Sequence, residues 1–346
     1  MRPFCRALAI TIPLLAFLAL AQQARNAGPY KMLKRVTVGG VGGFDYVDAD
    51  EAGRRLYIAR SGDGARISVF DLDRLEPAGE IPNVRAHGAV VSPKSHHGFA
   101  SSKPIVMFDA KTLAIIRTID VQGNPDGMFY DAFNDRVYVL SHAMPYVTVI
   151  NAADGNVLGT IDIGGMPEEA ASDGKGHLYI DVEDKGNIAV VDAKTMTVIS
   201  HYDLEGKGGT CAGLAMDAKN GILFAACRNP QTMVILKASD GKIISTFPVG
   251  LAPDGAVFNP KTMEAFVPGR DGTLTVVKEK SPTDFEIEQT VETLPNAKTL
   301  TLDRRTNRIL LIMADYTVPQ IPATAGGRGN QGQMVPDSFS ILVVSK

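Results

Sequence analysis

Cysteine and histidine are scarce in this chain, which has only 3 Cys and 6 His in 346 residues. No two cysteines are spaced as CxxC, and no His and Cys have the spacing of a zinc site. These absences exclude a zinc finger or a thiol redox centre built on such motifs.

The short motifs of common catalytic sites are missing as well. The chain contains no GxSxG nucleophile elbow, no HExxH helix and no Walker loop. Residues 101–103 (SSK) have no base at a fixed spacing and are typical of a plain loop. We therefore favour a protein that is not an enzyme, and a metal-dependent hydrolase stays open as the alternative.

A long apolar run occurs only within the first 21 residues. Arg2 and Arg6 flank its start, residues 7–20 are almost wholly apolar, and residues 19–21 (ALA) are small, as signal peptidase requires. We interpret residues 1–21 as a cleaved signal peptide. An uncleaved anchor is the alternative, although the run is shorter than a typical membrane span. We expect a periplasmic or secreted protein that has no membrane span after cleavage.

The mature chain has little excess charge of either sign. Removing residues 1–21 takes away two arginines, which leaves 33 of the 35 basic side chains beside 38 acidic ones. This mildly acidic balance argues against nucleic acid as the main partner, because phosphate backbones are bound by basic surfaces.

What the chain does contain is a segment of about forty residues that recurs seven times. Each copy has a short apolar run, a turn, a second run, a loop, a third run closed by Asp or Asn, and a last alternating run. Each copy therefore predicts a four-stranded antiparallel meander. The first runs, 39 to 44 residues apart, end at Asp48, Ser92, Asp131, Asp173, Asp217, Asn259 and Asp303.

Seven such meanders predict an all-β fold, a seven-bladed β-propeller over residues 31–346, because each blade must bury its faces against two neighbours. The last copy supplies only three strands, at 297–302, 308–313 and 339–344. Residues 33–40 resemble the outer strand at 116–123, so we expect this N-terminal strand to complete the last blade. Pairing of the two chain ends would remove the open sheet edge of the ring.

Residues 317–338 interrupt the last copy between its second and third strands. Their Pro, Gly and Gln content cannot form a core of its own. We expect this loop insertion to be either a lid over the channel or a disordered hairpin.

Cys211 and Cys227 lie on adjacent predicted strands of the fifth copy. If Asp217 pairs with Gly221 across the turn, Cys211 lies opposite Cys227. An oxidising compartment then favours a disulfide. Two buried free thiols are the alternative, because a register error of one residue turns the side chains to opposite faces.

The repeats resemble the YVTN repeat of the YncE-like family of exported bacterial seven-bladed propellers. The second strands read LYIA at 56–59, VYVL at 137–140 and LYID at 178–181, and the third strands contain VFD at 69–71 and VIN at 149–151. The similarity covers roughly residues 31–346, although no copy keeps YVTN intact. The resemblance implies the fold; it implies no single activity, because members of the family range from nucleic-acid or ligand binders to surface proteins.

The Thr-Asn part of the repeat is replaced by varied and often charged residues. In an antiparallel meander, the loops that start each blade and the loops that follow each second strand lie at one end of the channel. The blade starts hold Asp45, His87, Asp126, Glu168 or Glu169, Asp254 and Lys298. The second strands are followed by Arg60, His142, Glu183, Arg228, Arg270 and Asp315. These charges indicate a functional site, because a desolvated charge costs free energy unless it is paired or wet.

Three interpretations of these residues stay open. In the first, a small anion such as a carboxylate, phosphate or acidic glycan is bound by Arg60, His87, His142, Arg228, Arg270 and Lys298. In the second, a hard cation such as calcium is held, as in lactonase and regucalcin-like propellers, by His87 with Asp126, Glu169 and Asp254. In the third, opposite charges pair across a water-filled channel. Asp126 and Asp254 each lie between a Pro and a Gly, so a turn is the structural alternative for both.

The function that we expect is therefore that of an exported, monomeric binding or scaffold module. Its partner at the channel mouth would be a small anionic ligand or an extracellular protein or glycan. A metal-dependent lactonase or other hydrolase, with calcium as its possible cofactor, is the alternative.

Overall fold

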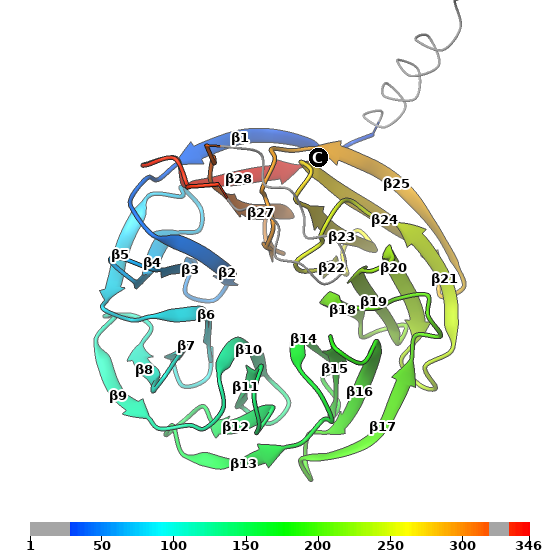
Figure 1. Ribbon diagram of the computed structural model, residues 1–346, viewed down its shortest axis with the longest axis horizontal. Coiled ribbons are helices and arrows are strands. Elements are labelled where there is room, and N and C mark those ends of the chain that lie inside the picture. The colour runs from blue at the N-terminus through cyan, green and yellow to red at the C-terminus, as the bar shows by residue number, and fades with distance from the viewer. Residues whose placement is uncertain (1–27, 318–331) are drawn as a thin grey trace, which may run out of the picture.

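The computed structural model describes residues 28–317 and 332–346, which form an all-β ring of seven four-stranded antiparallel sheets (Figure 1). In six sheets the strands follow one another along the chain, from the central channel to the outer edge. The predicted seven-bladed β-propeller is confirmed. The predicted signal peptide, residues 1–21, lies outside the described residues. Within the described residues, no helix is long and apolar enough to cross a bilayer.

The blades are numbered here in chain order. Blade 1 consists of β2 (Gly43–Asp50), β3 (Arg55–Ser61), β4 (Arg66–Asp71) and β5 (Pro77–Pro82). Blade 2 consists of β6 (Ala86–Val91), β7 (His97–Ser102), β8 (Ile105–Asp109) and β9 (Ile115–Ile119). Blade 3 consists of β10 (Pro125–Asp131), β11 (Arg136–Ser141), β12 (Val147–Asn151) and β13 (Val157–Ile161). Blade 4 consists of β14 (Pro167–Ser172), β15 (His177–Val182), β16 (Asn187–Asp192) and β17 (Thr197–Asp203).

The remaining three blades follow the same order, except that the last takes its outer strand from the N-terminal part of the chain. Blade 5 consists of β18 (Cys211–Asp217), β19 (Ile222–Arg228), β20 (Gln231–Lys237) and β21 (Ile243–Pro248). Blade 6 consists of β22 (Val257–Asn259), β23 (Glu264–Gly269), β24 (Thr273–Ser281) and β25 (Asp284–Glu292). Blade 7 consists of β26 (Leu300–Asp303), β27 (Arg308–Met313), β28 (Ser340–Ser345) and β1 (Lys31–Thr37).

Blade 7 joins the two ends of the described chain. Its strand order is β1-β28-β27-β26, and β1 pairs antiparallel with β28, with Val36 opposite Ile341. Upstream of β1, the backbone of Tyr30 exchanges two hydrogen bonds with the Gln289 side chain in β25, at 2.9 and 2.8 Å. The ring closure predicted from the sequence is therefore confirmed.

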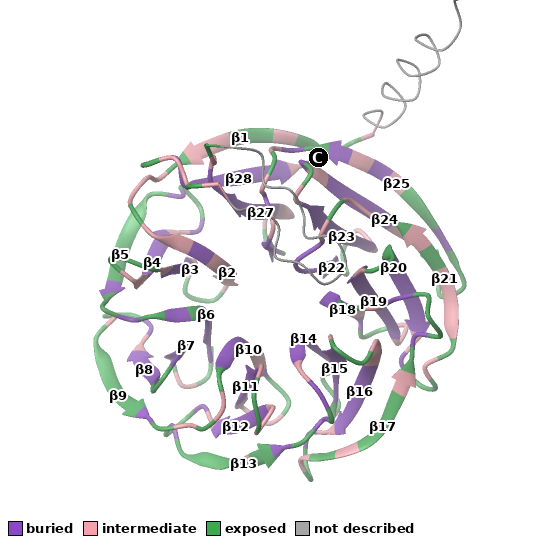
Figure 2. Cartoon of the chain, viewed as in Figure 1, coloured by how far each residue is buried: buried purple, intermediate pink, exposed green. Residues whose placement is uncertain are grey.

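The hydrophobic cores lie between neighbouring blades. The second and third strands of each blade are buried, whereas the outer strands are largely exposed (Figure 2). Tyr57 in β3 and Tyr179 in β15 cross from blade to blade, because their hydroxyls donate to the carbonyl oxygens of Ala110 and Ala238 in the next blade, at 3.2 and 3.1 Å. Strands covered on both sides explain why the second and third runs of each copy are almost continuously apolar.

A β-bulge recurs near the start of the first strand in blades 1 to 5. In each case the first strand has two residues where the second strand has only one, for example between Phe44 and Val47 in β2. A bulge interrupts the alternation of side chains and changes the direction in which they point. The two consecutive residues of each bulge therefore both lie beside the central channel.

The bulge in β18 also determines the cysteine pair. The structure pairs Asp217 with Ile222, so the predicted pairing of Asp217 with Gly221 is wrong by one residue. The extra residue between Cys211 and Leu214 compensates for this error and places Cys211 opposite Cys227. Their sulfurs are bonded at 2.00 Å, which confirms the predicted disulfide.

The described ends of the predicted loop insertion pair with each other. Tyr316 forms an antiparallel bridge with Met334, and the Val335 amide donates to the Asp315 carbonyl at 2.8 Å. Tyr316 and Met334 also pack against the core between blades 7 and 1. Residues 318–331 lie outside the described residues.

Arg60 stabilises the connection between blade 7 and blade 1. It is only 1% exposed, and its guanidinium donates to all five carbonyl oxygens of residues 39–43, at 3.1 to 3.3 Å. Three glycines in this loop have positive φ, which lets the carbonyls converge. The guanidinium also lies 3.8 Å from the ring centroid of Phe339. Burial lowers the pKa of Arg60 to about 10.

Arg60→Lys should lower the free energy of unfolding by about 2 kcal/mol, because an ammonium cannot satisfy five fixed carbonyls. Urea denaturation measures the change. Arg117→Lys is the matched control, since Arg117 donates to a single backbone carbonyl at the exposed outer edge. Equal unfolding midpoints for the two variants would contradict this role of Arg60.

Candidate functional site

Eight ionisable side chains of alternating charge close a ring at the mouth of the central channel. Each contacts the next, and all seven blades contribute at least one member. We call this set the mouth ring; in order of contact it consists of Asp45, His87, Asp126, His142, Glu168, Arg228, Asp254 and Lys298, which returns to Asp45.

Histidines and carboxylates alternate along one half of the mouth ring. His87 Nδ1 lies 2.8 Å from Asp45 Oδ2 and 3.1 Å from Asp126 Oδ1. His142 Nε2 lies 3.5 Å from Asp126 Oδ2 and 2.8 Å from Glu168 Oε2. The hydrogen bond that His142 donates to Glu168 raises the pKa of His142 to about 9, and the one that His87 donates to Asp45 raises the pKa of His87. Each histidine nitrogen is thus placed between two carboxylates.

Permanent cations occupy the other half. Arg228 Nη1 donates to Glu183 Oε1 at 2.8 Å, and its Nη2 contacts Asp254. Asp254 also accepts from Arg270 at 3.0 Å and lies 3.2 Å from Lys298. Burial disfavours the charge on Asp254, but these three cations hold the pKa of its carboxyl below the usual value. Each cation of the mouth ring that was expected to bind an anion therefore contacts a carboxylate already, as does Arg270.

The other predicted residues lie elsewhere. Glu169 faces away from the mouth ring and accepts from the backbone amides of Leu214 and Ala256, at 2.7 and 3.2 Å, so its neighbour Glu168 is the ring member. Arg60 is buried under the loop that joins blades 7 and 1. Asp315 pairs with Arg35 of β1 at 2.7 Å. For Glu169 the reason is the bulge in β14, which interrupts the alternation of side chains, whereas Arg60 and Asp315 turn toward tertiary partners.

Tyr46 is a channel residue that no sequence motif singled out. It follows Asp45 in the bulge of β2, and its hydroxyl donates to the Glu168 carbonyl at 3.2 Å and lies 3.5 Å from Asp126 Oδ2. A Cβ at Gly88 would lie 3.2 Å from Tyr46 Cβ, and one at Gly127 would lie 3.4 Å from its hydroxyl. Glycine at the matching position of blades 2 and 3 therefore leaves room for the tyrosine beneath the mouth ring.

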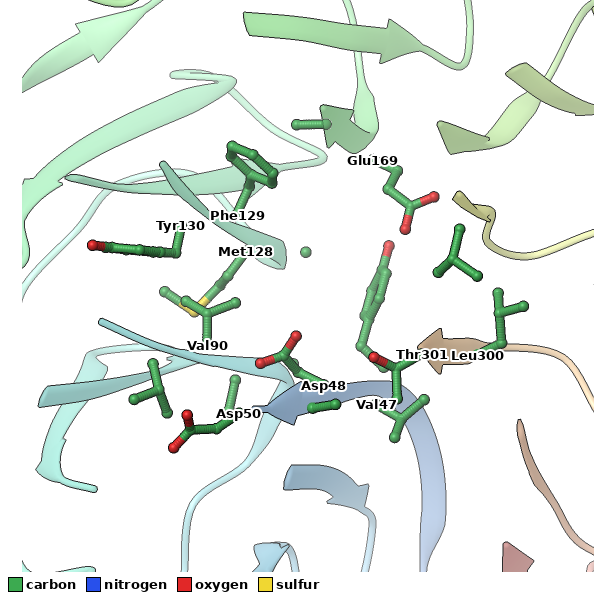
Figure 3. Close-up of a pocket in the computed structure, with 18 of the residues that line it drawn as sticks. Val47, Asp48, Asp50, Val90, Met128, Phe129, Tyr130, Glu169, Leu300 and Thr301 are labelled. Atoms are coloured by element: carbon green, nitrogen blue, oxygen red, sulfur yellow. The ribbon is translucent and has the colours of Figure 1, made fainter. Parts of the chain in front are cut away.

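A cavity of about 560 Å³ begins at Tyr46 and extends along the first strands toward their C-terminal ends. We call it the channel cavity. Its walls are mainly apolar and include Val90, Met128, Phe129 and Leu300 (Figure 3). The channel thus has a charged mouth at one end and an apolar chamber behind it.

Two carboxyls point into the channel cavity from different walls, Asp48 from β2 and Glu169 from β14 (Figure 3). Burial raises the pKa of Glu169 to about 8. Burial and the nearby carboxyls of Asp50 and Glu51 raise the pKa of Asp48 to about 7. Perturbed carboxyls that converge on a cavity are typical of ligand or catalytic sites.

Comparison with known proteins adds no family: no protein-family model and no curated protein matches the chain. The fold and the site therefore define a class of architecture, a seven-bladed propeller with a charged mouth ring and a channel cavity.

Arg228→Ala should destabilise the fold by about 3 kcal/mol, because it removes the cation that Glu183 contacts and one of the three cations around Asp254. Arg74→Ala is the control: Arg74 also contacts two carboxylates, but its side chain is 67% exposed, so little change is expected. Urea denaturation of both variants checks this. If they unfolded alike, the mouth ring would not contribute to stability.

Asp48→Asn should raise Tm at pH 8 by about 2 °C and leave it unchanged at pH 4. The folded carboxyl keeps its proton up to about pH 7, whereas the unfolded one loses it near pH 4, so the wild type loses stability as pH rises between these values. Melting curves at pH 4, 6 and 8 measure the difference. A difference that is constant with pH, or that the exposed Asp63→Asn variant shares, would contradict the raised pKa.

Proposed function

We propose that the protein is a binding module that takes a small ligand into the channel cavity. The observation that carries the proposal is the cavity itself, because its volume of about 560 Å³ falls within the range of about 300–1,000 Å³ of small-molecule sites. Apolar walls with a few convergent polar groups are also typical of such sites. Tyr46 and the mouth ring close one end, so the ligand would enter where the first strands end.

The carboxyls around the channel cavity favour a cationic ligand, because a bound cation would stabilise their charged forms against the burial that raises their pKa. Asp48 and Glu169 point into it, and Asp50 and Glu51 line its open end. Arg304 is the one Lys or Arg among the described lining residues, and its guanidinium contacts Glu51 at 2.7 Å. An anion in the cavity would therefore meet carboxyls without a free cation to offset them.

The ligand class that we propose is a small organic cation with an apolar body. Phe129 and Tyr130 of β10 also line the cavity, from opposite faces of the strand, so an ammonium group would lie near aromatic rings (Figure 3). The apolar remainder of the wall would cover the rest of the molecule. Such a ligand would place its charge near Asp48.

An anionic ligand at the mouth ring stays a prediction. An anion would have to displace Asp254 or Glu183 from Arg228, and Asp45 or Asp254 from Lys298. Breaking these partly buried pairs costs free energy, which argues against this reading.

Membership of the YncE-like family and export from the cytoplasm belong to the same proposal. The seven-bladed ring agrees with the resemblance of the repeats, although other proteins share that architecture. The disulfide between Cys211 and Cys227 suits an oxidising compartment. Together with the predicted signal peptide, these features support a protein that works in the periplasm or outside the cell.

Three probes of nearly equal size and different charge test the proposal: benzylamine, benzyl alcohol and benzoate. We expect benzylamine to bind most tightly in calorimetric titrations and benzoate least. Asp48→Asn should weaken benzylamine binding about tenfold, equivalent to about 1.4 kcal/mol, and leave benzyl alcohol unaffected. Asp63→Asn, in an exposed loop, is the matched control.

Two outcomes would count against this function. Tightest binding of benzoate would favour the anionic ligand expected from the sequence. If none of the three probes bound, and saturating probe left Tm unchanged, the channel cavity would not be a site for such ligands.

A further inference from the structure

Six donor atoms gather on the histidine side of the mouth ring. One group consists of Asp45 Oδ2, His87 Nδ1 and Asp126 Oδ1, and the other consists of Asp126 Oδ2, His142 Nε2 and Glu168 Oε2. In each group the three residues offer ligand atoms within 4.8 Å of one another. The two groups meet at Asp126, which gives one oxygen to each.

The cations of the mouth ring contact the opposite oxygens of the end carboxylates. Lys298 bonds to Asp45 Oδ1 at 2.5 Å, while Oδ2 faces His87. Arg228 lies 3.6 Å from Glu168 Oε1, while Oε2 faces His142. Lys298 and Arg228 therefore fix the orientation of these carboxylates and direct one oxygen of each toward a histidine nitrogen.

The spacing of the donor atoms fits metal coordination. Two ligands bound to one zinc ion at ordinary bond lengths and angles are about 3.0–3.4 Å apart. The corresponding distances here are 2.8 and 3.1 Å around His87, and 3.5 and 2.8 Å around His142. The histidine side chains are 46% and 32% exposed, so water can complete the coordination of each ion.

We propose that the mouth ring binds two divalent transition-metal ions, one in each group, bridged by the carboxylate of Asp126. Each ion replaces the proton that the histidine nitrogen shares with its two carboxylates. Carboxylate-bridged ion pairs of this kind are common in proteins. Among the proposed metal ligands, Glu168 also lines the channel cavity, whereas the other four residues do not, so the metal site is largely separate from the ligand site proposed there.

The donor set selects among metals. Each group offers one imidazole nitrogen and two carboxylate oxygens, which suits Zn²⁺ and related transition metals. Calcium takes six to eight oxygen ligands, and Mg²⁺ also prefers oxygen ligands with several waters. We therefore expect Zn²⁺ to bind and Ca²⁺ not to compete with it.

Calorimetric titration of the mature, metal-free chain with Zn²⁺ tests the proposal, with elemental analysis after dialysis. About two Zn²⁺ per chain are expected, and Tm should rise by about 3 °C or more at saturation. His87→Gln and His142→Gln should each leave about one ion, and Asp126→Asn should weaken binding of both. Co²⁺ titration adds a second readout, because visible absorption reports nitrogen and oxygen coordination directly.

His177→Gln is the matched control. His177 Nδ1 also contacts a carboxylate, that of Asp173, at 2.9 Å, but this pair lies outside the mouth ring. The variant should still bind about two ions. Circular dichroism of each metal-free variant separates loss of binding from loss of fold.

Several results would overturn the proposal. The mouth ring would consist of ion pairs without a metal site if no Zn²⁺ stayed bound after dialysis. The same would follow if the His142→Gln and His177→Gln variants lost Zn²⁺ equally. If the wild-type chain bound only one ion, and both the His87→Gln and the His142→Gln variant lost it, the two-ion arrangement would be overturned. Binding of Ca²⁺ as tight as that of Zn²⁺ would overturn the choice of metal.

Discussion

The bulge near the start of the first strand is the constraint on which the channel depends. In a regular strand, consecutive side chains would point to opposite faces. The extra residue instead allows Asp45 to join the mouth ring while Tyr46 occupies the channel beneath it, and Glu168 and Glu169 divide the same two tasks in blade 4. Adjacent residues in the sequence thus serve the mouth ring and the channel cavity beneath it.

The electrostatics of the mouth ring follow from its geometry. Seven first strands converge on one opening, so charges of one sign would repel one another strongly in a partly desolvated place. Alternation of sign removes this repulsion. The two halves nevertheless differ, because Arg228 and Lys298 keep their charge at any ordinary pH, whereas His87 and His142 are charged only when they are protonated. The half of the mouth ring that contains histidine is therefore the half whose charge depends on pH.

The sequence was sufficient for the fold because the fold is a repeat. A period of about forty residues with four runs per copy has few solutions, and the short last copy indicated how the ring closes. Side-chain direction was less predictable, since it depends on alternation that the bulges interrupt. This is why Glu169 was expected in place of Glu168, and why the cysteine pair was right although the turn at Asp217 was wrong by one residue.

Residues whose role depends on tertiary contacts were the hardest to predict from the sequence. Arg60 follows a second strand like the mouth residues, yet it turns under the loop at residues 39–43, whose carbonyls no repeat pattern reveals. Tyr46 had no motif, and its signal was indirect, namely glycine at the matching position of other blades, such as Gly88 and Gly127. A large side chain at a repeat position where other blades have glycine indicates a channel residue.

The pairing of β1 with β28 determines when blade 7, and with it the ring, can close during synthesis. During synthesis from the N-terminus, β1 emerges before any other described strand, and its partner β28 emerges after all of them. The six blades in between can form as an open arc, but the disc is completed only when nearly the whole chain has left the ribosome. A ring that closes only at this stage stays unfolded at its closing blade for longer than one whose first strands pair with each other.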